Sequence, residues 1–253
     1  MRTIFITGGS SGIGAATAES FNNNNWRVII SSRNKEKLNQ TRKLIIGNSN
    51  NKEIYSIPCD ISKREEIHEV VKDIEENIAP IDIALLNAAA YSPNKSQEFD
   101  IENYNLLIDV NLKGTLNCIE ILQKLMGIRK KGHIAIVASP AGYRGLPTAG
   151  AYCLTKAGLI NLAESLYFDF KKLGIRVSVI NPGFIESAST KKNTFPMPFI
   201  KTSSFAAEKI FHGLTKTTKF EISFPFFFLR MLKLARILPY PIYFYLINKI
   251  TGL

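Results

Sequence analysis

The sequence predicts an α/β fold in which a parallel sheet of about seven strands is covered by helices on both faces. Two observations support this prediction. Short runs of β-branched and aromatic residues alternate with longer helical patterns, as in a doubly wound sheet. The 253 residues suffice for one large domain, and no repeat or linker divides them. The expected strands cover residues 3–7, 27–31, 53–57, 81–86, 132–138, 175–180 and 220–223.

The first expected strand runs directly into a glycine-rich turn and then a helix-forming segment. Gly8 permits a tight turn, Gly12 lets a pyrophosphate approach the backbone at the helix N-terminus, and Gly14 lets the helix pack closely on the strand. A strand, a glycine turn and a helix in this order are typical of a Rossmann-type dinucleotide site. The cofactor contacts predicted in this turn are Thr7, Gly8, Ser10, Ser11, Gly12, Ile13 and Gly14.

The second expected strand ends where an NAD-specific site would place an acid on the ribose 2′-hydroxyl. Ser32 and Arg33 stand there instead, and the Arg33 guanidinium suits a 2′-phosphate. NADP(H) is therefore the expected cofactor and NAD(H) the less favoured one. The alternative role for Arg33 is stacking on adenine, which would not separate the two cofactors.

A second motif further along the chain combines a hydroxyl, a phenol and an ammonium. Ser139 precedes Tyr152, and Lys156 lies one helical turn after the tyrosine. A free phenol has a pKa of about 10, so a nearby ammonium would help it exchange a proton near neutral pH. The motif predicts a hydride-transfer site at which one carbonyl oxygen meets these groups. Taken alone, Tyr152 and Lys156 could equally be an exposed helical pair.

With both motifs present, the sequence resembles the classical short-chain dehydrogenase/reductase family. Residues 7–14 match its signature T-G-x-x-x-G-x-G, and the resemblance covers residues 1 to about 188. The chain departs from the family at Leu86-Asn87-Ala88-Ala89, where Asn-Asn-Ala-Gly is usual, and at Ser187, where a threonine commonly binds the nicotinamide carboxamide. Three further motifs follow in the family's order: Asn87-Ala88-Ala89-Ala90, Asn111, and Asn181-Pro182-Gly183.

The resemblance implies an oxidoreductase that interconverts a ketone and a secondary alcohol. Tyr152 would transfer the proton, Lys156 would hold the nicotinamide ribose, and Ser139 would position the substrate oxygen. Asn111 would anchor a water that links Lys156 to solvent. The remaining cofactor contacts implied are Ser32, Arg33, Asp60, Ile61, Asn87, Ala88, Ala89, Tyr152, Lys156, Pro182, Gly183, Ile185 and Ser187.

The family resemblance also implies a homo-oligomer, either a dimer or a tetramer. Helices expected over roughly 101–126 and 148–172 carry long apolar stripes that in this family pack against a second subunit. Burial within one subunit is the alternative explanation for those stripes.

Composition restricts the compartment and the class of partner. Three cysteines without C-x-x-C spacing and three scattered histidines predict neither a disulfide framework nor a metal site. The first strand begins at Thr3, which leaves no room for a signal peptide, so we expect a cytoplasmic protein. Of the net charge of +11, most lies in residues 189–253, which hold 10 basic and 2 acidic residues. These basic residues punctuate an apolar segment rather than a nucleic-acid module, so no nucleic-acid partner is expected.

That segment predicts an amphipathic helical extension over 224–253, following a catalytic domain over 1–223. On a helical wheel, Arg230, Lys233 and Arg236 share one side opposite an apolar arc, a pattern found in helices at membrane surfaces. The longest charge-free run, 237–248, has twelve residues and two prolines, too short to span a bilayer. We therefore expect peripheral contact of 225–253 with the cytoplasmic membrane face. A lid over the substrate cleft or a subunit interface is the alternative.

The sequence thus favours an NADP(H)-dependent oxidoreductase acting on a small carbonyl or alcohol that is apolar or lipid-like. Two other functions remain open. One is an NAD-dependent alcohol dehydrogenase, and the other is a cofactor-binding regulatory or scaffold protein on the same fold. Loss of Tyr152 or Lys156 would have favoured the last of these, and both are present.

Overall fold

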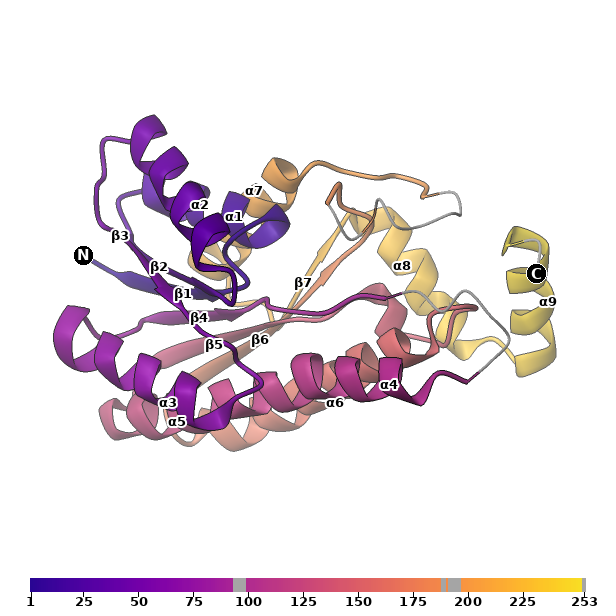
Figure 1. Cartoon of the computed structure of the whole chain (residues 1–253). Helices are drawn as coiled ribbons and strands as arrows, with labels where there is room; N and C mark the ends of the chain where they lie inside the picture. The colour runs from indigo at the N-terminus through magenta and orange to yellow at the C-terminus, as the bar shows by residue number, and fades with distance from the viewer. Residues whose placement is uncertain (93–98, 188–189, 191–196, 252–253) are drawn as a thin grey trace.

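Seven parallel strands form a single sheet in the order β3-β2-β1-β4-β5-β6-β7 (Figure 1). The structure is a computed structural model that describes residues 1–92, 99–187, 190 and 197–251, so the last two residues of the predicted extension lie outside it. The predicted fold class is confirmed, and each strand lies within two residues of its expected bounds. The strands are β1 (Thr3–Thr7), β2 (Arg27–Ser32), β3 (Ile54–Pro58), β4 (Ile83–Leu86), β5 (Gly132–Val137), β6 (Ile175–Pro182) and β7 (Glu221–Phe224).

The order of the strands reverses next to β1, which pairs with β2 on one side and β4 on the other. The chain builds β2 and β3 outward from β1, then crosses back to build the other half of the sheet. All five residues of β1 are buried, as expected for a central strand covered on both faces. Ligands of doubly wound sheets bind outside the carboxyl ends of the strands at such a reversal, which places the candidate site beside Thr7.

Helices cover the two faces of the sheet in separate groups (Figure 1). One face carries α1 (Gly12–Asn23), α2 (Lys35–Asn48) and α7 (Ser203–Lys216); the other carries α3 (Arg64–Asp73), α4 (Ile101–Leu107), α5 (Gly114–Arg129) and α6 (Gly150–Lys171). Successive side chains of a strand point to opposite faces. Accordingly, Ile4 and Ile6 join the apolar core beneath α1, whereas Phe5 joins the core beneath α5.

The predicted helix over 101–126 is interrupted in the structure. A π-helical turn, η2 (Ile108–Lys113), separates α4 from α5. π-helical turns inside helices are rare and occur frequently at functional sites, and this one carries Asn111. α5 then continues to Arg129 and ends at Lys130, whose backbone is left-handed with φ of 51°.

The C-terminal extension is helical, as predicted, and lies near the carboxyl ends of the strands (Figure 1). It consists of α8 (Phe226–Leu234), a short 3-10 turn η5 (Ala235–Ile237) and α9 (Tyr240–Thr251). Its fully covered side chains are Leu229 on α8 and Tyr243 on α9. Among the described residues, no helix combines the length and apolarity needed to cross a membrane.

Candidate active site

A cavity of about 600 Å³ opens at the carboxyl ends of the strands. Its wall brings together almost every residue predicted for the site. The exceptions are Thr7, Gly14 and Asn111, which lie behind the wall. The predicted residues that line the cavity are Gly8, Ser10, Ser11, Gly12, Ile13, Ser32, Arg33, Asp60, Ile61, Asn87, Ala88, Ala89, Ser139, Tyr152, Lys156, Pro182, Gly183, Ile185 and Ser187.

Thr7 and Gly14 shape the glycine loop from behind. The Thr7 hydroxyl accepts hydrogen bonds from the backbone N–H groups of Asn87 (3.0 Å) and Ala88 (3.1 Å), which ties β1 to the end of β4. A Cβ on Gly14 would lie 2.3 Å from the Gly8 carbonyl oxygen, so no other residue fits there without a shift of the loop. These two residues therefore fix the shape of the loop from outside the cavity wall.

The loop presents backbone to the cavity in a form that suits a dinucleotide. Gly8 (φ +69°) and Gly12 (φ +54°) both adopt the left-handed region that favours glycine. Helix α1 begins at Gly12, and its N-cap Ser11 makes no side-chain cap, which leaves the first N–H groups for a phosphate. A Cβ on Gly8 would lie 2.8 Å from the Ala88 Cα, so only glycine fits at this turn of the loop. The residues present fit a pyrophosphate.

The far end of the cavity, at the tip of β2, carries positive charge and buried serine hydroxyls. Ser32 Oγ is buried and lacks a hydrogen-bond partner among the described residues, as expected for a group that awaits a ligand. Arg33 is exposed and forms no ion pair within the described part of the chain. Sequence reasoning missed Asn34 and Lys37, which line the same end. Asn34 caps α2 by accepting from Lys37 N–H (2.8 Å), a spacing that could have revealed both.

Asp60 lines the cavity with its carboxylate already partly engaged. Its Oδ1 accepts from the backbone N–H (3.0 Å) and the hydroxyl (2.7 Å) of Ser62. Helix α3 begins at Arg64 after the N-cap Lys63, so Ser62 is engaged with Asp60 and does not cap the helix.

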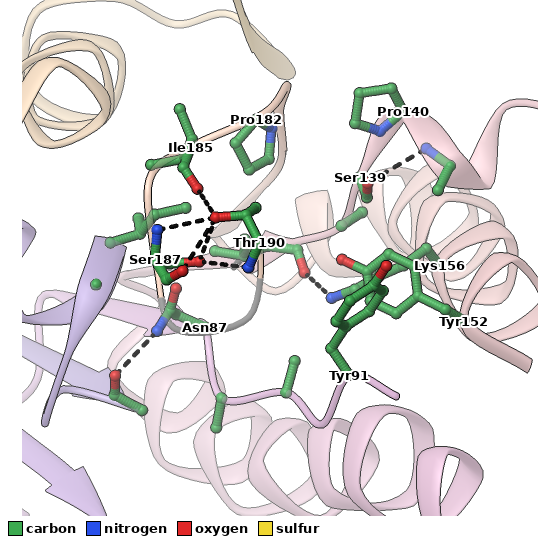
Figure 2. A pocket seen from close by; sticks show the side chains of 18 of the residues that line it. Asn87, Tyr91, Ser139, Pro140, Tyr152, Lys156, Pro182, Ile185, Ser187 and Thr190 are labelled. Carbon is green, nitrogen blue, oxygen red and sulfur yellow. Dashed lines mark hydrogen bonds between the residues drawn. The ribbon is translucent and has the colours of Figure 1, made fainter. Parts of the chain in front are cut away.

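The predicted hydride-transfer group stands at the other end of the cavity (Figure 2). Tyr152 and Lys156 come from α6, and Ser139 precedes the short turn η3 (Pro140–Gly142). Burial raises the pKa of Tyr152 to about 12, although a hydrogen bond with Ser139 lowers it in part. Burial also lowers the pKa of Lys156 to about 8.

The expected lowering of the Tyr152 pKa by Lys156 is absent in this structure. The Lys156 ammonium lies 5.6 Å from the centre of the Tyr152 ring and donates to the carbonyl of Val137 at 2.8 Å. The ammonium thus makes its hydrogen bond to β5. Burial is therefore the largest effect on the pKa of the Tyr152 phenol. The two side chains are neighbours on one helix, as predicted, but the exposed-pair alternative is wrong because Lys156 is only 2% exposed.

Asn111 lies behind this group and connects it to the end of β4. Its side chain accepts from the N–H of Ala90 (2.7 Å) and donates to the Ala90 carbonyl (3.1 Å) and to Thr155 Oγ1 (3.2 Å). The Thr155 hydroxyl in turn donates to the carbonyl of Tyr152 (2.9 Å). Buried Asn111 therefore connects the backbone at Ala90 to helix α6 at Thr155.

Several residues on the cavity wall were not predicted. Tyr91 lies against Tyr152, and Thr190 donates to the Ile185 carbonyl (2.8 Å) while accepting from Ser187 N–H (2.9 Å) (Figure 2). Tyr91 directly follows the Asn87 motif, a position that could have marked it. The C-terminal extension contributes Phe228, Leu232, Ala235, Tyr243 and Ile247, and the segment after η3 contributes Arg144 and Leu146.

Comparison with known proteins agrees with this geometry. The profile of the short chain dehydrogenase family matches residues 2–197. An uncharacterized oxidoreductase of Myxococcus xanthus is 30% identical over 242 residues, which cover 96% of this chain and 94% of the relative. An uncharacterized oxidoreductase of Staphylococcus aureus strain MW2 is 29% identical over 185 residues, 73% of this chain and 78% of the relative.

Solved structures share the fold at low sequence identity. An actinorhodin polyketide ketoreductase with NADPH aligns with a TM-score of 0.78 and 22% identity, over 88% of this chain and 95% of that chain. A serine dehydrogenase complexed with NADP+ aligns with a TM-score of 0.76 and 22% identity, over 88% and 94%. The chain therefore belongs to the classical short-chain dehydrogenase/reductase family of NAD(P)-dependent oxidoreductases.

Proposed function

We propose that this protein is an NADP(H)-dependent oxidoreductase that interconverts a ketone and a secondary alcohol. In this proposal residues 1–223 are the catalytic domain and 224–253 close over the substrate. One observation carries the proposal: Ser139, Tyr152 and Lys156 stand on the wall of the same cavity as the glycine loop. A substrate carbonyl bound beside Ser139 and Tyr152 would therefore share this cavity with a nicotinamide bound along the glycine loop.

Each residue has a distinct chemical task in this proposal. A bound reduced nicotinamide supplies the hydride. Tyr152 donates its phenol proton to the carbonyl oxygen, and Ser139 Oγ holds that oxygen by a hydrogen bond. Lys156 would hold the nicotinamide ribose hydroxyls, and its ammonium lies 5.6 Å from the centre of the Tyr152 ring. Asn111 is a positioning residue, because it acts on the others through Ala90 and Thr155.

The preference for NADP(H) rests on charge at the tip of β2. Arg33 and Lys37 supply two cations, the Ser32 hydroxyl is unpaired among the described residues, and β2 ends without an acid. A 2′-phosphate would form charge-assisted hydrogen bonds there. Solved relatives of this fold that contain NADPH or NADP+ are consistent with the preference.

The apolar substrate class rests on the walls that the extension adds. Phe228, Leu232, Tyr243 and Ile247 face the cavity beside Leu146. An alkyl chain or ring that moves from water onto this wall is stabilised by about 25 cal/mol for each Å² of apolar surface buried.

A carbonyl screen tests the proposal directly. Purified protein is mixed with NADPH and a set of aliphatic and cyclic ketones, and loss of NADPH absorbance is followed. Turnover with apolar ketones supports the proposal. Equal rates with NADH would favour the NAD-dependent dehydrogenase. NADPH binding without turnover on any ketone or alcohol would favour the regulatory protein.

We further propose that the extension contacts anionic membrane surfaces. Its outer side exposes large apolar side chains, including Phe227 (72%) and Leu234 (64%). Residues 222–253 hold four basic residues and no acid. Arg230, Lys233 and Arg236 are all exposed, as a basic side of the extension requires, and Lys233 also pairs with Glu221.

The proposed homo-oligomer rests on exposed apolar residues of α5 and α6. Leu116 on α5 and Leu154 on α6 are each 47% exposed, and Phe168 on α6 is 70% exposed. Light scattering coupled to size exclusion tests this proposal. A monomer at micromolar concentration would contradict it.

A further inference from the structure

The C-terminal extension lies over the substrate end of the cavity as a lid, which we define as residues 226–251. Its two helices are held in different ways. α8 buries Leu229 in the fold, and Lys233 pairs with Glu221, whose carboxylate also accepts from Tyr143 (2.6 Å) and Asn181 (2.8 Å). α9 buries only Tyr243 among its described residues.

One residue outside the lid holds α9 in place. Arg144 Nη1 donates to the carbonyl of Ala235 (2.5 Å) and to that of Leu238 (2.9 Å), where the chain turns from η5 toward α9. Its guanidinium carbon lies 3.9 Å from the ring centre of Tyr243 and 5.0 Å from that of Tyr240. A planar guanidinium suits both tasks, since it donates in its plane and stacks on aromatic faces.

The backbone next to Arg144 adds a further contact to the same helix. The Tyr243 hydroxyl donates to the carbonyl of Gly145 at 2.7 Å. Arg144 itself lies five positions after Ser139, in the segment that carries the catalytic serine into the cavity. The segment that carries Ser139 therefore also fixes the position of α9.

We infer that Arg144 is a specificity-determining residue: by holding α9 against the cavity, it makes the site accept bulky or long apolar ketones. The inference rests on the proposed function for its substrate class. Tyr243 and Ile247 of α9 form the cavity wall beside Leu146, two residues after Arg144. Without the Arg144 contacts, α9 retains the hydrogen bond from Tyr243 to Gly145 but loses the contacts to the carbonyls at its start and to its two rings, while α8 keeps Leu229 and the Glu221 pair. The far apolar wall would then open to water, and the cofactor end would be unchanged.

Three variants test the inference. Arg144→Ala removes the hydrogen bonds and the ring contacts. Arg144→Lys keeps a cation that can donate to the carbonyls but removes the planar guanidinium that stacks on the rings of Tyr240 and Tyr243. Arg230→Ala is the matched control, because it removes an equal charge from the exposed side of α8, where Arg230 lies 4.7 Å from the Phe226 ring centre.

The assay is NADPH-dependent reduction of a series of straight-chain 2-ketones of increasing length. Lost wall contacts change kcat/KM by about tenfold or more for each methylene affected. We expect Arg144→Ala to lower kcat/KM for the longest ketones at least tenfold more than for the shortest, mainly through KM. Arg144→Lys should lie between, and Arg230→Ala should match the wild type. An equal fall at every length, or no change, would overturn the inference.

Hydrogen exchange gives a readout that does not depend on activity. In Arg144→Ala and Arg144→Lys, amides of 240–251 should exchange faster, while those of 226–234 and the dissociation constant of NADPH stay at wild-type values. Unchanged exchange in 240–251 would contradict the hold of Arg144 on α9, even if no ketone were turned over. Absence of turnover by the wild type would contradict the proposed function instead, so the two failures are separable.

Discussion

The rings of Tyr91 and Tyr152 meet edge to face, with their centres 4.9 Å apart and their planes at 81° (Figure 2). Tyr91 follows Ala90, whose N–H and carbonyl are both bound by the Asn111 side chain. Asn111 also reaches Thr155, one turn along the helix from Tyr152. The proposed proton donor is therefore held on two sides, by its own helix and by an aromatic ring from the end of β4.

Replacing Tyr91 with leucine should slow the reaction without removing the donor. Edge-to-face pairs contribute about 0.5–1.5 kcal/mol beyond their buried area, so kcat should fall about three- to tenfold. Tyr91→Phe keeps the ring and should retain a wild-type kcat. Steady-state rates on a confirmed ketone measure both variants, with NADPH affinity as the control. A wild-type kcat in Tyr91→Leu would show that the contact does not position Tyr152.

Tyr152→Phe should remove most turnover and leave cofactor binding nearly intact, because only the group that transfers the proton is deleted. Positioned acid–base groups contribute about 10²–10⁴-fold to rate. Single-turnover rates and NADPH titration measure the two effects separately. If Tyr152→Phe kept the wild-type rate, another residue on the cavity wall would have to be the donor.

Arg33→Ala should weaken NADPH binding and leave NADH binding unchanged. A hydrogen bond between charged partners contributes about 1.5–3 kcal/mol, so the dissociation constant of NADPH should rise at least tenfold. Lys37→Ala should give a smaller loss in the same direction. Fluorescence titration with both cofactors provides the comparison. An Arg33→Ala variant with unchanged preference would assign that arginine to adenine stacking.

Titration of buried Lys156 should make the free energy of unfolding depend on pH in the alkaline range. Its pKa is about 8 in the folded protein against 10.5 unperturbed. Between these values the unfolded chain keeps the proton that the folded protein has lost, so unfolding binds a proton and stability rises with pH. Lys156 alone should contribute a rise of about 1 kcal/mol in the free energy of unfolding for each pH unit from about 8 to 10. Buried Cys59, Cys118 and Cys153, whose pKa values are raised, oppose this rise above pH 9. The Lys156 contribution is therefore measured as the difference in urea denaturation between the wild type and Lys156→Met. An identical slope in the variant would assign it to other groups.

The lid should hold the protein on anionic vesicles. Its exposed apolar side chains can insert, and each basic residue near such a surface adds about 1 kcal/mol, an attraction that salt screens. Full-length protein should pellet with anionic liposomes at low salt and less so at high salt. Phe227→Glu with Leu234→Glu should abolish binding while NADPH binding persists. Wild-type protein that stayed in the supernatant would leave the lid without a membrane role.

The strands and the glycine loop could be predicted because their causes are local. Runs such as that of β1 bury every side chain, and Gly8 and Gly12 adopt backbone angles that their residue type permits. The direction of the Lys156 ammonium could not be predicted in this way. It points to the Val137 carbonyl on a neighbouring strand, and this contact exists only after the sheet and α6 have packed.

The substrate end of the site was harder to predict for the same reason. Arg144 and Leu238 are 94 positions apart, and no periodic pattern connects them. A helical wheel groups Lys233 with Arg230 but does not indicate that Lys233 pairs with Glu221 on β7. Amphipathicity shows that a helix has two sides, but the partner charge on another element decides which side a long lysine takes.

The separation of α8 and α9 from the cofactor loop makes the chain divisible by recombination. The residues that shape the glycine turn lie before Phe224, whereas the extension after it completes the far wall of the cavity together with Arg144 and Leu146. A chimera joined at this point would keep Arg144, Gly145 and Glu221 as attachment points for a foreign tail. We therefore expect exchange of this one terminal segment to change the range of proposed substrates and to leave the cofactor loop unchanged.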